Sequence, residues 1–217
     1  GMTHGFGGCK PWGKQEHVKF LCPVPGYDRH FAVTEYFGVE MIPVPMLKTG
    51  PDMDLIERLV EKDESIKGCW CVPKYSNPTG VTYSDETVRR FAALKPAAKD
   101  FRIMWDNAYC VHDLTDTPDT LLNLYEECLK QGTEDNVLFF ASTSKISFPG
   151  AGVAALGASA RNIVDLKKRF TTQTIGPDKL NQLRHILFLH DLDGVYSLMQ
   201  GHRKILEPKF RIVEEAL

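Results

Sequence analysis

Three short segments of the chain end apolar runs with side chains that could take part in catalysis. Lys145 follows the small hydroxylated residues of STSK, Asp106 and Tyr109 lie in IMWDNAY, and Asn77 lies in SNPTG. Taken one at a time, they have ordinary interpretations, namely a solvated lysine, a helix N-cap and an Asn-Pro turn. Each segment nevertheless follows a run typical of a buried strand, and α/β folds place their chemistry at the ends of such strands.

Together these side chains fit one kind of cofactor chemistry. A lysine amine can form a Schiff base with an aldehyde cofactor, and a carboxylate can pair with a protonated pyridine nitrogen. An asparagine amide and a tyrosine hydroxyl can hydrogen-bond to the phenolic oxygen of such a ring. Small hydroxyl groups near the lysine can hold a phosphate. The set therefore indicates a pyridoxal-type cofactor, provided that the fold brings the segments to one place.

The elements that must position these side chains alternate along the sequence. Short apolar runs typical of strands are followed by longer helical patterns over most of the chain. The expected strands are 18–22, 39–44, 68–72, 103–105, 136–141 and 153–158, and the expected helices are 28–37, 52–62, 84–98, 118–130 and 160–171. This alternation favours a mainly parallel sheet that is covered by helices on both faces.

The C-terminal segment has a different pattern. From Gly176 onward it contains no further strand and predicts two long helices. Pro177 is expected in the first turn of the first of them, and Pro208 is expected to start or kink the last helical piece. We therefore expect an incomplete cofactor-binding large domain over 2–195 and, over 196–217, a long helix leading toward a missing small domain. The residue before Met2 is set aside because it resembles one left by tag removal.

Composition and charge narrow the function class. The 217 residues are 43% hydrophobic and 25% charged, which is ordinary for a globular chain with a sizeable core. A net charge of -2 gives no basic surface for nucleic acid, and no apolar run is long enough to span a membrane. The six cysteines form no disulfide framework, and Cys69 and Cys71 should face the same side of one strand. Reduced thiols and a cytoplasmic location are expected.

The histidines carry no metal-site pattern. His112 lies two residues after Cys110 without a second pair of ligands nearby, and His185 and His190 fall on different faces of a predicted helix. These residues are interpreted as core or rim side chains, and no metal is expected.

The order and spacing of the three segments resemble those of the class I/II aminotransferases, the pyridoxal 5′-phosphate (PLP) enzymes of fold type I. NPTG is followed by D-x-A-Y and then by S-x-S-K, and PVPGYDRHFAVTEYFGVEMIPVP at 23–45 is similar to the family's P-x-Y segment. The resemblance covers essentially the whole chain and is closest to the bacterial aspartate and MocR-like branch. It implies a three-layer α/β/α large domain with a mixed, mainly parallel sheet.

The resemblance also implies a role for each matching residue. Lys145 would hold the cofactor as a Schiff base and move the proton during the reaction, and Asp106 would pair with the pyridinium nitrogen. Asn77 and Tyr109 would hydrogen-bond to the ring oxygen. The remaining implied contacts are the stacking of Tyr27 on the ring face and the binding of the phosphate by Ser142 and Ser144.

The sequence departs from the family pattern in two respects. Gly152, in PGAGV, occupies the place of an arginine that clamps the phosphate in family members, and a bidentate arginine–phosphate pair is a strong contact. The family's glycine-rich phosphate turn and substrate-gating arm before this region, and its carboxylate-binding arginine after it, are missing. We therefore expect a chain truncated at both ends, with impaired activity.

The implied reaction is ping-pong amino-group transfer between an amino acid and a 2-oxo acid in a homodimer. No nucleic-acid or membrane partner is expected, and the amino-acid donor is not readable from the sequence. Two alternatives stay open at this point. One is a non-catalytic effector-sensing domain of a transcriptional regulator, against which the near-neutral charge and the lack of a winged-helix segment count. The other is a PLP-dependent lyase or decarboxylase.

Overall fold

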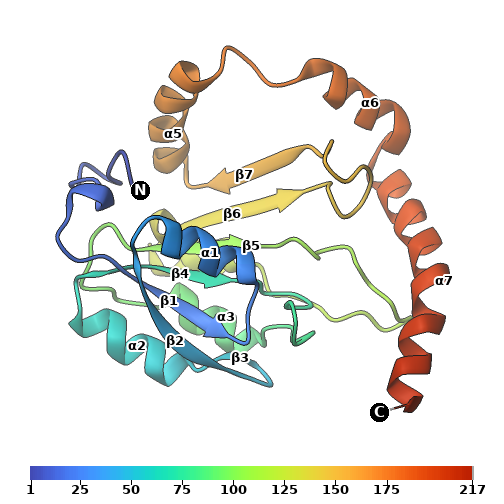
Figure 1. The fold of residues 1–217 in the computed structure, drawn as a ribbon, viewed down its shortest axis with the longest axis horizontal. Coiled ribbons are helices and arrows are strands. Elements are labelled where there is room, and N and C mark those ends of the chain that lie inside the picture. The colour runs from blue at the N-terminus through green and yellow to red at the C-terminus, as the bar shows by residue number, and fades with distance from the viewer. Residues whose placement is uncertain (217) are drawn as a thin grey trace.

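The structure, a computed structural model, describes residues 1–216 and contains one mixed sheet of seven strands within them (Figure 1). The sheet order is β3-β2-β1-β4-β5-β6-β7. The strands are β1 (Lys19–Val24), β2 (Glu40–Leu47), β3 (Gly50–Pro51), β4 (Ile66–Cys71), β5 (Arg102–Asp106), β6 (Val137–Ser142) and β7 (Ala154–Ala158). The five central strands β2, β1, β4, β5 and β6 are parallel to one another. The edge strands β3 and β7 run antiparallel to their neighbours, which confirms the mixed, mainly parallel sheet.

The helices cover both faces of this sheet. They are α1 (Asp28–Tyr36), α2 (Met53–Lys62), α3 (Asp85–Ala92), α4 (Leu124–Gln131), α5 (Ala160–Gln173), α6 (Lys179–Leu189) and α7 (Leu192–Ala216), with short 3₁₀ turns at Trp12–Lys14 and Glu134–Asn136. On one face, α2, α3 and α4 contribute Ile56, Phe91 and Leu124 to a core that includes Cys69 and Ile103 of the strands. Burial of these apolar side chains is the main force that holds the layers together.

The other face has a smaller core. Phe31 of α1 and Leu166 of α5 pack with Phe20, Met104 and Leu138 of the strands. The two cores on opposite faces confirm the three-layer α/β/α architecture. The larger core also contains the thiols of Cys69 and Cys71, whose Sγ atoms lie 3.8 Å apart on the same side of β4, as the sequence predicts.

The predicted strands are all present, but one further strand was missed, and the end of α3 and the start of α4 were predicted wrongly. The two-residue strand β3 is too short to leave a pattern in the sequence. Helix α3 begins after the expected N-cap Ser84, whose hydroxyl accepts from Thr87 N, but it ends at Ala92 rather than at 98. Pro96 follows closely and cannot donate to a continuing helix. Helix α4 begins at Leu124 rather than at 118, because the side chain of Asn123 caps it.

The two C-terminal helices are confirmed, but Pro177 lies before the first of them and Pro208 does not start a new helix. The side chain of Asp178 accepts a hydrogen bond from Asn181 N and caps α6, so Pro177 precedes that helix instead of lying in its first turn. Helix α7 begins at Leu192 and continues through Pro208 without a new start. Because Pro208 has no N–H, the backbone carbonyl of Lys204, four residues earlier, lacks its helical hydrogen bond. Lys204 is exposed, so water can bind this carbonyl instead.

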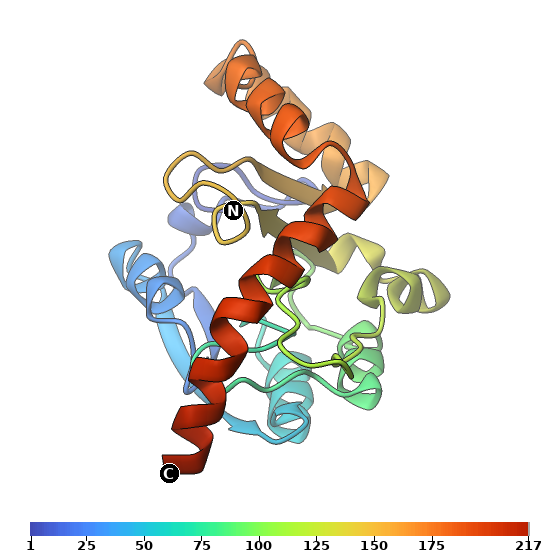
Figure 2. The same cartoon turned by 90° about the vertical axis from the view of Figure 1, so that its right-hand side faces the viewer.

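The carboxyl ends of β1, β4, β5 and β6 meet at one edge of the sheet because these strands are adjacent and parallel. Helix α7 crosses this edge diagonally (Figure 2). The guanidinium group of Arg203 fixes α7 there by donating to the carbonyl of Leu114 (3.1 Å) and to the carboxylate of Asp116 (2.8 Å). None of the helices within residues 1–216 is both long enough and apolar enough to cross a membrane.

Candidate active site

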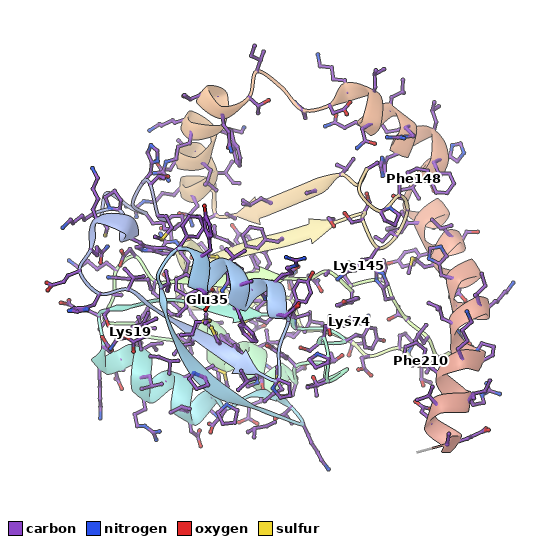
Figure 3. The ribbon with its side chains drawn as sticks, viewed as in Figure 1. Lys19, Glu35, Lys74, Lys145, Phe148 and Phe210 are labelled. Atoms are coloured by element: carbon purple, nitrogen blue, oxygen red, sulfur yellow. The ribbon has the colours of Figure 1, made fainter. Side chains whose placement is uncertain are left out.

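The candidate side chains lie at or after the carboxyl ends of neighbouring strands at this edge of the sheet. Tyr27 follows β1 and is the N-cap residue of α1, Asp106 is the last residue of β5, and Ser142 is the last residue of β6. Lys145 lies on the turn after β6, beyond the end of that strand (Figure 3). Asp106 is followed by a turn and not by a helix, so its alternative interpretation as an N-cap was wrong.

The amine of Lys145 lies between two tyrosine rings. Its Nζ donates a hydrogen bond to the hydroxyl of Tyr109 at 2.8 Å and lies 4.1 Å from the centroid of that ring. The same Nζ also lies over the ring of Tyr27, 5.4 Å from its centroid. The lysine side chain is exposed, so the amine is held in place by these contacts and is still reachable by a small molecule.

The carboxylate of Asp106 is held by a histidine that the sequence analysis missed. His30 Nε2 donates to Asp106 Oδ2 at 2.9 Å, and the imidazole is stacked on the indole of Trp70, with centroids 4.3 Å apart and planes within 11°. His30 and Tyr27 also pack in a T-shaped arrangement, with ring centroids 5.2 Å apart. Since His30 is three residues after Tyr27 in the first turn of α1, the i,i+3 spacing was the available indication of this contact.

The turn that carries Lys145 is closed by its own backbone. The carbonyl of Thr143 accepts from Ile146 N (2.9 Å) and from Ser147 N (2.8 Å). Ser142 Oγ accepts from Ser144 N at 3.3 Å, so the two predicted phosphate-binding serines lie on one side of a compact turn. This geometry places two hydroxyl groups close to the lysine backbone.

Gly152 packs directly against this turn. A Cβ atom at its position would lie 2.5 Å from Ser144 Oγ and 2.9 Å from Ser144 N. Any side chain would therefore collide with backbone as well as with a hydroxyl group. The arginine of the family pattern has no room at this position, and the close approach of two backbone segments is the physical reason for glycine.

A second histidine holds the backbone of the lysine. His112 Nε2 lies 3.2 Å from the carbonyl oxygen of Lys145, and since a carbonyl only accepts, Nε2 carries the hydrogen. Burial lowers the pKa of His112, so the neutral ring is favoured. The sequence predicts a core or rim side chain here, whereas His112 joins the loop after β5 to the lysine turn.

Asn77 lies at the same edge but outside this cluster of contacts. Its segment forms the expected turn, with Gly80 N donating to Ser76 O at 2.6 Å and with Gly80 in the left-handed region at φ +71°. The Asn77 side chain is half-buried, and no hydrogen bond found within residues 1–216 joins it to Lys145 or Asp106. The structure thus brings Lys145, Tyr109 and Tyr27 together and links Asp106 to them through His30.

The residues of this site fit PLP. They supply an accessible amine flanked by aromatic rings, an anchored carboxylate, and serine hydroxyls on the turn beside the amine. The phosphate would rely on hydroxyl and backbone donors, because Gly152 leaves no arginine there. This donor set is suited to a planar, anionic ring compound that carries an aldehyde.

Comparison with known proteins agrees with the fold and the motifs. Residues 1–217 match the family described as aspartate amino-transferase. A Mycolicibacterium smegmatis protein with an aminotransferase name is 54% identical over 213 residues, which are 98% of this chain and 50% of that protein. The aspartate aminotransferase of Corynebacterium glutamicum is 47% identical over 208 residues, which are 96% of this chain and 48% of that enzyme.

The structural comparison gives the same result. The crystal structure of an aspartate transaminase from Corynebacterium glutamicum superimposes with a TM-score of 0.91 at 46% identity, over 95% of this chain and 48% of that one. The chain spans about half the length of the curated relatives it matches. On the match over its whole length, the chain belongs to the aspartate aminotransferase family.

Proposed function

We propose that this chain binds PLP at Lys145 and serves amino-group transfer between an amino acid and a 2-oxo acid. The observation that carries the proposal is the 2.8 Å hydrogen bond from Lys145 Nζ to Tyr109 OH, next to a carboxylate anchored by His30. Membership of the aspartate aminotransferase family supports the reaction class. Because the chain spans about half of its relatives, its activity on its own is part of the proposal.

When bound, PLP supplies an electron sink that stabilises negative charge at the substrate α-carbon. Lys145 would hold the cofactor through its aldehyde group, with loss of water, and, once the substrate amine has displaced it, would move the proton from the substrate α-carbon to the former aldehyde carbon. The hydroxyl of Tyr109 holds the lysine amine in place and accepts one of its hydrogens. Tyr27 keeps the amine from swinging into solvent and offers a flat surface for the ring.

The other residues bind and orient. Asp106 presents its carboxylate to the ring nitrogen, and His30 prevents that carboxylate from rotating by holding Oδ2. Ser142 and Ser144 bind the phosphate, and Asn77 binds the ring oxygen from the turn that follows β4. The family's aspartate aminotransferases support aspartate as the amino donor. We further propose a homodimer, as the family resemblance implies, and a cytoplasmic location, which the free cysteines support.

An absorption measurement tests the cofactor assignment. The purified chain is mixed with PLP, reduced with borohydride, and mapped by mass spectrometry. We expect a visible band and a reduced adduct on Lys145, and loss of both in Lys145→Ala. The matched control is Lys48→Ala, which removes an exposed lysine of the β2–β3 turn and should leave both unchanged. An adduct that persists elsewhere in Lys145→Ala would overturn the assignment.

Product analysis tests the reaction class. The chain is supplied with aspartate and a 2-oxo acid, and the products are identified by mass spectrometry. A new amino acid formed from the 2-oxo acid is expected for amino-group transfer. Release of carbon dioxide or ammonia without a new amino acid would indicate a decarboxylase or lyase.

A further inference from the structure

Helix α6 carries a buried histidine that contacts the lysine turn. His185 is 6% exposed, whereas the side chains of Ile186 and Leu187 next to it are 60% and 64% exposed. His185 Nε2 lies 2.9 Å from Thr143 Oγ1 and 2.8 Å from Ser147 Oγ. These two hydroxyl residues stand on either side of Lys145 in the sequence, two positions before it and two after it.

A phenylalanine completes the contact between helix and turn. The ring of Phe148 packs against His185 in a T-shaped arrangement, with centroids 5.5 Å apart, and against Phe188, with centroids 5.0 Å apart. In Figure 3, Phe148 lies beside α6, on the far side of the turn from Lys145. The apolar ring therefore shields the imidazole. The hydrogen-bond partners of the imidazole are the hydroxyl groups of the turn and a backbone carbonyl of its own helix.

The hydrogen bonds define which nitrogen carries the hydrogen when the imidazole is neutral. His185 Nδ1 lies 2.8 Å from the carbonyl oxygen of Asn181, which can only accept, so Nδ1 carries the hydrogen. Nε2 of a neutral ring is then an acceptor. Thr143 Oγ1 already accepts from Val153 N at 2.9 Å, which leaves its hydrogen free for Nε2. The hydroxyl of Ser147 can donate instead to the carbonyl oxygen of Thr143, which lies 3.2 Å from Ser147 Oγ. The single lone pair of His185 Nε2 then has to accept only the hydrogen of Thr143.

Thr143 connects this histidine to the position of the lysine. Its carbonyl closes the turn through Ile146 and Ser147, and its N–H donates to Val153 O at 2.9 Å. Fixing the Thr143 side chain therefore fixes the backbone on which Lys145 stands. The Lys145 side chain is exposed, and its amine reaches Tyr109 and Tyr27 only if the backbone of the turn is in place.

We propose that His185 is a positioning residue for Lys145. Its neutral Nδ1–H ring, carried by α6, holds Thr143 and Ser147 and thereby keeps the lysine amine beside Tyr109. His185 does not reach the reacting atoms and acts through the turn. The functional meaning rests on the proposed role of Lys145, but the contact itself is a property of the chain without cofactor.

Two variants separate the contact from general packing. His185→Leu keeps an apolar side chain of similar bulk and removes both hydrogen-bonding nitrogens. His185→Gln places an amide oxygen near the position of Nε2 and so can still accept from Thr143. Leu187→Ala changes an exposed residue on the same helix and is the matched control.

Amide hydrogen exchange of the chain without cofactor is the first measurement. In His185→Leu we expect exchange at Ile146 and Ser147 to rise at least tenfold while exchange in β4 and β5 stays as in the parent, with His185→Gln in between and Leu187→Ala unchanged. Unchanged exchange at Ile146 and Ser147 in His185→Leu would overturn the proposal, as would an equal rise throughout the sheet.

Imidazole ¹⁵N NMR of the parent chain is the second measurement and needs no variant that must fold. We expect a protonated Nδ1 and an unprotonated Nε2 for His185, the reverse of the tautomer that is preferred by free histidine. A protonated Nε2 would overturn the proposal, because that nitrogen could not accept from Thr143.

Titration with PLP links the contact to the cofactor. We expect the Lys145-dependent absorption band to form with about tenfold weaker apparent affinity in His185→Leu and to be partly restored in His185→Gln. If the parent chain forms no such band, the proposed function fails, while exchange and NMR still decide the role of His185. If the band forms but is equally strong in His185→Leu, Lys145 keeps its role and the positioning role of His185 is refuted.

Discussion

His30 Nε2 lies 2.9 Å from Asp106 Oδ2, and the same imidazole is stacked on Trp70. A strand-end carboxylate is thereby tied to the first turn of α1, whose N-cap residue Tyr27 lies next to the lysine amine. Two sides of the site, the carboxylate and the Tyr27 ring, are therefore oriented by one histidine.

Replacing that histidine should weaken cofactor binding. In His30→Ala the carboxylate of Asp106 loses its fixed partner, and hydrogen bonds to charged groups contribute about 1.5–3 kcal/mol. We expect apparent PLP affinity, followed by absorbance titration, to fall roughly tenfold or more. His17→Ala, which removes an exposed histidine, is the control. Equal affinities in the two variants would show that Asp106 needs no partner.

The hydroxyl of Tyr109 should matter more than its ring. Tyr109→Phe keeps the aromatic surface and removes the acceptor that lies 2.8 Å from Lys145 Nζ. We expect weaker PLP binding, by about 1 kcal/mol, and a thermal midpoint close to that of the parent, because the site is at the surface. Tyr36→Phe, at an exposed tyrosine of α1, is the control. A large drop in the thermal midpoint with unchanged PLP binding would assign the hydroxyl to folding instead.

Restoring the family's arginine should fail. In Gly152→Arg the new Cβ would lie 2.9 Å from the backbone nitrogen of Ser144, and overpacking of this kind costs about 1–3 kcal/mol. We expect lower stability to urea and weaker PLP binding, and Gly152→Ala should show the same direction. Gly157→Ala is the control, because a Cβ there would meet Phe139 Cβ at an ordinary 3.5 Å. Tighter PLP binding by the arginine variant would contradict the structure.

Acid stability should depend on Asp63, at the opposite end of the sheet. The hydrogen bond from Ser65, with the Lys19 ammonium at 3.0 Å, lowers the pKa of Asp63 from 3.8 to about 2. Because the folded pKa is below the unfolded value, the stabilisation is present above about pH 4 and is lost as pH falls toward 2. We expect Asp63→Asn to flatten the loss of unfolding free energy between pH 4 and 2. Parallel pH profiles for the parent and the variant would exclude this carboxyl group as a source of acid sensitivity.

The sheet was predictable because apolar runs of strand length are a local property of the sequence. All six expected strands are present, and Lys145, Tyr109 and Asp106 lie at the edge where parallel strands end. The errors occurred where a single residue decides a boundary. Asn123 starts α4 by capping it, and Pro208 is tolerated because its turn faces water.

The histidines of the site were not predictable in the same way. His112 and His185 hold the lysine turn from segments that are far apart in the sequence, so their partners are defined only by the fold. A single histidine without a ligand pattern carries no local indication of what it will contact. His30 was missed as well, because its partner Asp106 is 76 residues away, and only its contact with Tyr27 follows from helical spacing.

The attachment of α7 by Arg203 has a mechanical consequence. Arg203 binds Leu114 and Asp116, and the loop to which they belong also contains His112, which holds the Lys145 carbonyl. A rigid displacement of α7 would therefore pull on the amine through this loop, so that the long C-terminal helix and the reactive nitrogen would shift in concert.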